Sequence, residues 1–296
     1  SADGNYEISC FGGSDGFITL QFDGGTGAYS YAWTGPDGFA ASTASLAGLR
    51  AGTYNLTVTD ASMCHRDYTY TLDQPDSLSI NVITSQTPDG AFSIGCNGGN
   101  GTVDITVAGG SGPGSYTYLW TKAEDPVWIN NQEDLTVTAG HYTLLVTDVN
   151  GCTNNRAVVL TEPAPLDIIT SVSDITCINA PAYDDGAIDL TVSGGKAPYL
   201  YSWTGPSGFV SVFEDISSLT QGTYNVTVTD AYGCQISADT LLSLPDPITL
   251  VTRASDYNGF NISCLGRSDG WIRVIPQSGN APYAYSWTGP SGFTAS

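Results

Sequence analysis

The chain contains a fourfold internal repeat, which constrains its fold more than any other feature. A Tyr-x-Tyr-x-Trp motif recurs with its tryptophans 87, 83 and 84 residues apart. Each copy is short and similar to the others, so we expect a tandem array of similar small domains and no single large core. The four tryptophans are Trp33, Trp120, Trp203 and Trp287.

Two further sequence blocks and three linkers set the repeat boundaries. A Gly-x-Tyr block follows the tryptophan in the first three copies, and a turn that begins with cysteine opens all four. Linkers that contain proline, which cannot extend a strand ladder, lie at 74–76, 162–165 and 244–247. A length of 296 residues suggests two domains, but this pattern predicts four. They are repeat 1 (1–75), repeat 2 (76–163), repeat 3 (164–245) and the shorter repeat 4 (246–296).

Each repeat has the pattern of an antiparallel β-sandwich. Segments such as 17–22, 103–107 and 142–146 alternate apolar and polar residues and end at Gly, Asp, Asn or Pro. Six to seven such strands in a repeat of about 85 residues indicate an immunoglobulin-like fold. We therefore predict an all-β chain of tandem immunoglobulin-like antiparallel β-sandwiches that touch across short linkers and form an elongated rod.

Two aromatic positions in each complete repeat, and Trp287 in repeat 4, are predicted to lie in the core. The tryptophan is expected to pack on a disulfide, and the tyrosine of the Gly-x-Tyr block matches the tyrosine corner of such sandwiches. These tyrosines are Tyr54, Tyr142 and Tyr224. The first tyrosine of the aromatic motif (Tyr29 in repeat 1), together with Trp128 and Trp271, which lie outside the repeated pattern, are the better candidates for a binding surface.

Seven cysteines predict disulfides and an oxidising, extracellular location. Pairing within a repeat gives three similar separations, of 54, 56 and 57 residues, which favours that connectivity. The predicted pairs are Cys10–Cys64, Cys96–Cys152 and Cys177–Cys234. We expect each bridge near one end of its sandwich, where it joins an early strand to the last hairpin. Cys264 remains, and we expect its partner outside this segment.

The charge of the chain excludes two classes of partner. Lys and Arg number 8 against 29 Asp and Glu, a formal net charge of −21. Nucleic acid and anionic membrane surfaces are both bound through clusters of basic residues, so neither is expected as a partner. A run of 18 apolar residues is also lacking, so we expect no membrane insertion.

Neither a metal site nor catalysis is strongly indicated. Aspartates that end the Gly-x-Tyr block, and an adjacent pair in repeat 3, offer oxygen ligands for calcium. Aspartate in such turns often bonds its own backbone instead, so we predict no cofactor and keep calcium as the alternative. The two histidines, His65 and His141, stand at non-equivalent positions, so no Ser-His-Asp set is expected and we predict no enzyme. The candidate aspartates are Asp60, Asp148, Asp230, Asp184 and Asp185.

The combined motifs resemble the SprB-type repeats of giant cell-surface proteins in Bacteroidetes, including gliding-motility adhesins. The resembling segments of repeat 1 are Ile-Ser-Cys-x-Gly-x-Ser-Asp-Gly (8–16), Gly-Gly-x-Gly-x-Tyr-x-Tyr-x-Trp (24–33), Leu-x-x-Gly-x-Tyr (49–54) and Val-Thr-Asp-x-x-x-Cys (58–64). The resemblance implies a surface-attached protein, exported by type IX secretion, whose repeats serve as an adhesive stalk. It also implies O-glycosylation at Asp-Ser/Thr-aliphatic sites, a pattern that Ser77 and Thr240 fit.

The predicted function is structural and adhesive. We expect a disulfide-pinned stalk segment of a large extracellular protein, whose partners are its neighbouring repeats, further copies in a fibre, or a surface polysaccharide. One alternative is a carbohydrate-binding array that uses exposed aromatic side chains. The other is an accessory segment of a large surface enzyme.

Overall fold

The computed structural model describes residues 6–112, 114–176, 184–279 and 281–296. The chain divides into two units, Ser1–Ala164 and Pro165–Ser296, so that repeats 1 and 2 belong to the first unit and repeats 3 and 4 to the second. Among the described residues the regular structure consists of β-strands and three short 3₁₀ turns. Within these residues, no helix has the length and apolar character needed to cross a membrane.

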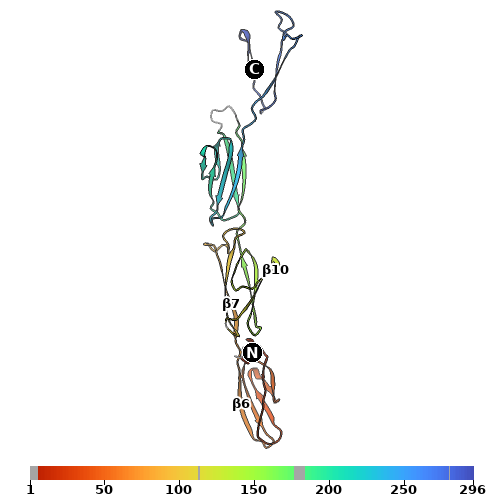
Figure 1. Cartoon of the computed structure of the whole chain (residues 1–296), viewed down its shortest axis with the longest axis vertical. Coiled ribbons are helices and arrows are strands. Elements are labelled where there is room, and N and C mark those ends of the chain that lie inside the picture. Colours follow the sequence, from red (N-terminus) through yellow and green to blue (C-terminus); the bar gives the residue numbers. More distant parts are fainter. Residues whose placement is uncertain (1–5, 113, 177–183, 280) are drawn as a thin grey trace. The chain divides into compact units, whose positions relative to one another are not determined.

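Repeat 2 is a sandwich of a four-stranded and a three-stranded antiparallel sheet. The larger sheet has the strand order β10-β9-β12-β13 and the smaller sheet the order β11-β8-β7. Strands β7 and β10, labelled in Figure 1, are edge strands of opposite sheets. The strands are β7 (Asp76–Thr84), β8 (Gly101–Gly110), β9 (Thr117–Lys122), β10 (Asp125–Asn130), β11 (Leu135–Val137), β12 (Gly140–Thr147) and β13 (Thr153–Leu160).

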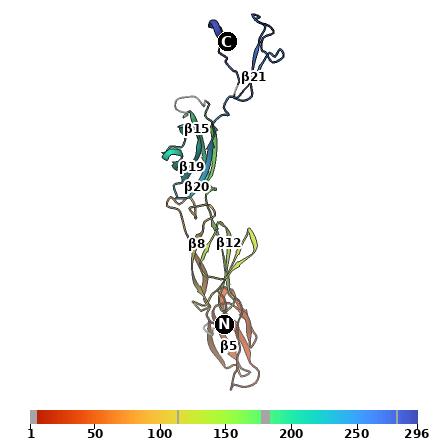
Figure 2. The same ribbon diagram turned by 45° about the horizontal axis from the view of Figure 1, so that its top comes forward.

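Repeat 3 has the same arrangement. Its sheets have the orders β17-β16-β19-β20 and β14-β15-β18, and Figure 2 labels β15 and β19 from the two sheets. The strands are β14 (Asp167–Ser173), β15 (Gly186–Ser193), β16 (Leu200–Thr204), β17 (Val210–Ser211), β18 (Ile216–Leu219), β19 (Gly222–Thr229) and β20 (Gln235–Leu242).

Repeats 1 and 4 show parts of this pattern. In repeat 1 the four-stranded sheet β3-β2-β5-β6 faces the pair β1-β4, and in repeat 4 the pairs are β21-β22 and β23-β24. The strands of repeat 1 are β1 (Gly16–Ile18), β2 (Ser30–Thr34), β3 (Ala40–Ala41), β4 (Leu46–Leu49), β5 (Gly52–Thr59) and β6 (His65–Leu72). Those of repeat 4 are β21 (Leu250–Ala254), β22 (Ile272–Pro276), β23 (Trp287–Thr288) and β24 (Thr294–Ala295).

The all-β, immunoglobulin-like fold is confirmed, with one difference in topology. In the constant-type immunoglobulin sandwich the fourth strand joins the first, second and fifth strands in one sheet. Here the fourth strand of each seven-stranded repeat, β10 or β17, pairs with the third strand, β9 or β16. The fourth strand thus lies in the same sheet as the tryptophan and tyrosine strands.

Each of repeats 1 to 3 has its own hydrophobic core, built from period-two alternation. On β12, Tyr142, Leu144 and Val146 all point inward, with at most 2% of each side chain exposed. The tryptophan and the tyrosine of each repeat lie in these cores. The six buried side chains are Trp33, Trp120, Trp203, Tyr54, Tyr142 and Tyr224. Trp287 of repeat 4 was also predicted to be a core residue, but it is only partly buried.

The polar atoms of these core aromatics are bonded to backbone carbonyls. The indole N–H of Trp120 donates to the carbonyl of Gln132 at 3.1 Å, and Trp33 and Trp203 make the equivalent bond. The hydroxyl of Tyr142 donates to the carbonyl of Thr138, four residues upstream, at 2.8 Å. Because Tyr54 and Tyr224 make the same bond at the same offset, the tyrosine corner is confirmed in all three complete repeats.

Candidate functional site

A disulfide joins repeat 1 to repeat 2 inside the first unit. Cys10 bonds Cys152, at a sequence separation of 142 residues. The predicted pairs Cys10–Cys64 and Cys96–Cys152 are therefore wrong, and Cys64 is an exposed free thiol. No tryptophan packs on a Cys10–Cys64 bridge, because that bridge does not form.

The sandwich itself separates the two cysteines that had been predicted to pair. The turn that contains Cys10 is held to the chain just beyond the end of β6, where the N–H of Gly12 donates to Oε1 of Gln74 at 2.8 Å. Cys64 directly precedes the other end of β6, which is eight residues long. A strand of that length spans about 26 Å, whereas the Cα atoms of a disulfide lie about 4–7 Å apart.

Hydrogen bonds reinforce this junction. The carbonyl of Ser9 accepts Oγ–H of Ser111 at 2.9 Å and Nδ2–H of Asn150 at 3.2 Å. Ser111 is fully buried, so its bond to repeat 1 is shielded from water. We call the Cys10–Cys152 disulfide with these two hydrogen bonds the clasp. It fastens the end of repeat 1 to the β12–β13 turn of repeat 2.

The remaining cysteines divide into bonded and free. Cys96 and Cys234 are disulfide-bonded, and Cys264 is free and exposed, like Cys64. The predicted Cys177–Cys234 pair involves Cys177, which lies outside the described residues.

The aspartates that end the Gly-x-Tyr block bind backbone amides. Oδ1 of Asp148 accepts the N–H groups of Asn150 and Cys152, and its Oδ2 accepts that of Ser111 at 2.8 Å. Asp60 and Asp230 make the same three kinds of bond. Such bonds favour the carboxylate form, and the amide of Thr26 is the main cause of the lowered pKa of Asp60. These carboxylates brace the turn beside the second cysteine and have little capacity left for calcium.

The acidic pair of repeat 3 offers no better metal site. Asp185 accepts the N–H and the hydroxyl of Thr176, and the hydroxyl is the main cause of its lowered pKa. Asp15 bonds Ser9 in the same way in repeat 1. Asp184 is exposed. Across the described part of the chain, no three His, Cys, Asp or Glu side chains gather in a metal-binding arrangement.

The first tyrosine of the aromatic motif donates a hydrogen bond to the carbonyl of a glycine upstream of it. In repeat 2, Tyr116 donates its hydroxyl to the carbonyl of Gly109 at 2.7 Å, and Tyr199 bonds Gly194 at 2.6 Å. Tyr29 makes the corresponding bond to the carbonyl of Gly24. The hydroxyls of these tyrosines are therefore used in local structure, and only their rings are left to contact a ligand. Trp271 remains a surface aromatic, with 51% of its side chain exposed.

Repeats 1 and 3 cover the tyrosine corner with a Gly-Pro turn. In repeat 1, Phe39 packs edge-on against Tyr54, with ring centroids 5.3 Å apart. The ring of Pro36 lies where a side chain on Gly52 would be, since a Cβ there would meet Pro36 Cγ at 2.4 Å. This close approach explains why the Gly-x-Tyr block begins with glycine.

In repeat 2 the tyrosine corner is covered by Trp128 and Lys122 instead of a Gly-Pro turn. Trp128, on β10, packs edge-on against Tyr142 with ring centroids 5.3 Å apart, as Phe39 does in repeat 1. The ammonium of Lys122 lies 5.3 Å from the centroid of the same ring. Trp128 is half-buried in this contact. Its side chain therefore covers the tyrosine corner and offers only part of its surface for binding a ligand.

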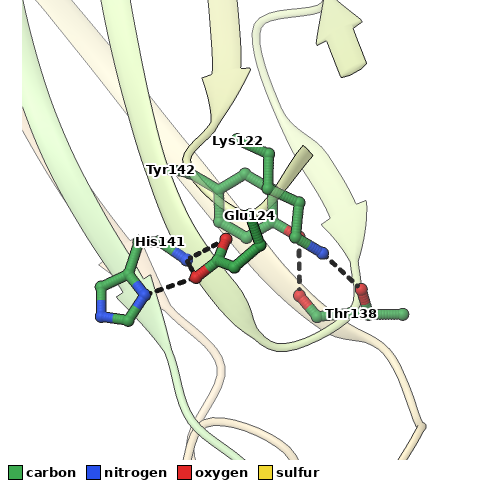
Figure 3. A network of polar contacts seen from close by, with 5 residues as sticks. All are labelled: Lys122, Glu124, Thr138, His141 and Tyr142. Carbon is green, nitrogen blue, oxygen red and sulfur yellow. Dashed lines mark hydrogen bonds and ion pairs between the residues drawn. The ribbon is translucent and has the colours of Figure 1, made fainter. Parts of the chain in front are cut away.

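A polar network specific to repeat 2 surrounds this corner (Figure 3). Glu124 accepts hydrogen bonds from the backbone N–H of His141 at 3.0 Å and pairs with its ring Nδ1 at 2.5 Å. Lys122 donates to the hydroxyl of Thr138 at 3.1 Å. The bond from the His141 side chain is the main reason why the pKa of Glu124 falls to about 2.

We expect this network to respond to acid. The folded-state pKa of Glu124 lies below its ordinary value of 4.5, so the carboxylate stabilises repeat 2 above that pH and loses this effect as the pH falls towards about 2. In a His141→Gln variant, the pKa of Glu124 should rise towards its ordinary value, as measured by carbon NMR titration of the side-chain carboxyl. His65→Gln, at the other histidine, is the matched control and should leave that titration unchanged. An unchanged titration in His141→Gln would contradict the assigned cause.

The two candidate glycosylation sites differ in exposure. Ser77 is exposed at the start of β7 and lines a cleft of about 470 Å³ beside the clasp. Thr240 is 6% exposed, and its hydroxyl faces that of Thr170 at 3.3 Å. The Thr240 prediction is corrected, because the alternation of β20 points this side chain into the sandwich, where a glycan does not fit. Ser77 stays a candidate.

The fold and the junction define a tandem array of immunoglobulin-like sandwiches with a covalent link between two consecutive repeats. The SprB repeat model matches residues 7–38, 93–124, 169–208 and 260–292. The chain therefore carries four SprB repeats, as its motifs indicated. Each match includes the first cysteine and the tryptophan of its repeat, and none includes Cys64, Cys152 or Cys234.

Solved structures with some similarity are also tandem-domain proteins. Three N-terminal domains of the bacteriophage RB49 outer capsid protein Hoc match at 15% identity with a TM-score of 0.38, over 80% of this chain and 94% of that one. A tetra-tandem repeat from the extending region of a large adhesion protein matches at 10% identity with a TM-score of 0.25, over 90% and 89%. The fold described above is defined by strand pairing and does not depend on these low scores. No curated protein matches the chain.

Proposed function

We propose that the chain is an adhesive stalk segment of a secreted cell-surface protein. The four SprB repeats are the observation that carries this proposal. The clasp supports it, because a covalent link between consecutive repeats suits a protein that must transmit force outside the cell. Disulfides also fit an oxidising, extracellular location. The proposal includes no catalytic step.

The finer parts of the proposal follow from the resemblance to gliding adhesins. We propose export by type IX secretion in a member of the Bacteroidetes, and a role in surface attachment during gliding. The net charge of −21 favours an extended, self-repelling surface polymer. Neighbouring repeats are the immediate partners, and a surface polysaccharide or a fibre of further copies is the proposed distal partner.

Surface labelling of intact cells tests this proposal. Antibody fragments raised against the oxidised chain should label cells of the source organism without permeabilisation, and treatment with external protease should remove the label. The same fragments should reduce attachment of the cells to a solid surface, whereas fragments against a cytoplasmic protein should have no effect. Labelling only after permeabilisation would contradict the proposal.

A further inference from the structure

We infer that the clasp carries mechanical load past repeat 1, so that residues 11–95 stay off the load path when the stalk is pulled. The covalent connectivity alone supports this bypass. Its biological use rests on the proposed function, because only an attached stalk would be pulled along its length.

The connectivity determines the load path. Cys10 precedes the first strand of repeat 1, and Cys152 directly precedes β13, the last strand of repeat 2. Force that enters before Cys10 crosses the disulfide and leaves through residue 153. The loop between the two cysteines, with a sequence separation of 142 residues, is then bypassed by the disulfide. Cys96, inside this loop, is itself disulfide-bonded, so the part that stays off the load path in the wild-type chain is residues 11–95.

The strands of repeat 1, β1 to β6, lie in the protected segment 11–95. The buried Trp33 and the tyrosine corner of Tyr54 are inside it. In repeat 2, only β13 follows Cys152, and it pairs with β12 along its whole length. Force can therefore strain β13, but it cannot lengthen the stalk by unravelling residues 11–95.

The hydrogen bonds of the clasp keep the joint closed without load. Ser9 is adjacent to Cys10, and its carbonyl is held by buried Ser111 and by Asn150 of repeat 2. Asp148 braces the other side, because it accepts the N–H of Cys152 at 2.9 Å and that of Ser111 at 2.8 Å. Cys10 is thus positioned by side chains of repeat 2, and Cys152 by the carboxylate of Asp148 in its own repeat.

Peptide mapping of the whole chain tests the connectivity first. The eight Lys and Arg residues place each of the seven cysteines on a different tryptic peptide, so a digest made without reduction identifies each pair. We expect peptide 1–50 linked to peptide 123–156, and Cys64 in peptide 51–66 accessible to alkylation. A link from peptide 1–50 to peptide 51–66 would overturn the inference.

Single-molecule pulling with handles at both ends then tests the bypass. A two-cysteine chain that keeps Cys10 and Cys152 should be about 500 Å shorter at full extension when oxidised than when reduced, at roughly 3.5 Å for each of 142 residues. Replacing Cys152 by Ser in that chain is the matched control, and oxidation should no longer change the length. The other cysteines, replaced by Ser in both chains, are Cys64, Cys96, Cys177, Cys234 and Cys264.

The outcomes separate this inference from the proposed function. Equal lengths in the oxidised and reduced two-cysteine chain would overturn the bypass, while surface labelling of cells would still decide the stalk proposal. If replacing the other cysteines prevents folding, the wild-type chain provides the second measurement. At full extension the oxidised wild-type chain must be shorter than the reduced chain by at least the length of the same 142 residues, because any further disulfide only shortens the covalent path.

Discussion

Replacing Cys10 and Cys152 together by serine is expected to lower the free energy of unfolding of repeats 1 and 2 by about 5 kcal/mol. The estimate comes from the chain-entropy relation for a closed loop with a separation of 142 residues. The reason is that the disulfide restricts the unfolded chain and so raises its free energy. Small sandwiches depend on such links, because a domain of this size buries only about 60–65% of its unfolded surface.

Hydrogen exchange followed by mass spectrometry measures this effect repeat by repeat. Amides of β5 and β12 should exchange more than a thousandfold faster in the double variant, at about 1.4 kcal/mol for each factor of ten. Amides of β19 in repeat 3 serve as an internal reference. Cys64→Ser is the matched control, because Cys64 is an exposed free thiol and its loss should change nothing. Equal protection in the double variant and the wild type would show that the clasp contributes no stability.

The fold could be predicted because its determinants are local. Alternation along β12 places Tyr142, Leu144 and Val146 on one face, and a strand needs no more than this pattern to bury one side. The Gly-x-Tyr block was equally informative, since the glycine accommodates the covering turn and the tyrosine hydroxyl bonds a carbonyl four residues upstream. Both signals are contained within a few residues of sequence.

The disulfide connectivity could not be inferred from regular spacing. In a tandem repeat every fixed offset between cysteines recurs at each period, so separations of 54, 56 and 57 residues carry no preference for pairing within a repeat. Counting strands is the better criterion. Five strands, β8 to β12, lie between Cys96 and Cys152. Because each strand reverses direction, an odd number leaves the two cysteines at opposite ends of the sandwich.

The surroundings of the tyrosine corner in repeat 2 depend on tertiary structure. Its sequence lacks the Gly-Pro turn, and the replacement for Phe39 is Trp128, which stands at a different distance from the motif tryptophan. The β9–β10 hairpin brings Trp128 back over Tyr142, with a register shift between Asp125 and Ile129. Such a substitution is visible only once the strands are paired, which is why Trp128 was predicted as a surface aromatic.

Trp120→Ala is expected to lower the free energy of unfolding of repeat 2 by about 3–5 kcal/mol, the range for removing a large aromatic side chain from a core. Trp120 is fully buried, and its indole N–H donates to the carbonyl of Gln132. The substitution leaves a cavity between the sheets and a carbonyl without its donor. Protection of β12 amides from hydrogen exchange measures the loss.

Trp128→Ala is the matched control, because it removes the same side chain from the same repeat at a half-buried position. Its contact with Tyr142 is an edge-on aromatic pair, worth about 0.5–1.5 kcal/mol beyond the area it buries. We therefore expect Trp128→Ala to cost clearly less than Trp120→Ala. If the two variants lost equal protection, Trp128 would belong to the core of repeat 2 rather than to its cover. If Trp128→Ala instead abolished binding to a polysaccharide and left protection unchanged, the carbohydrate-binding alternative would gain its first support.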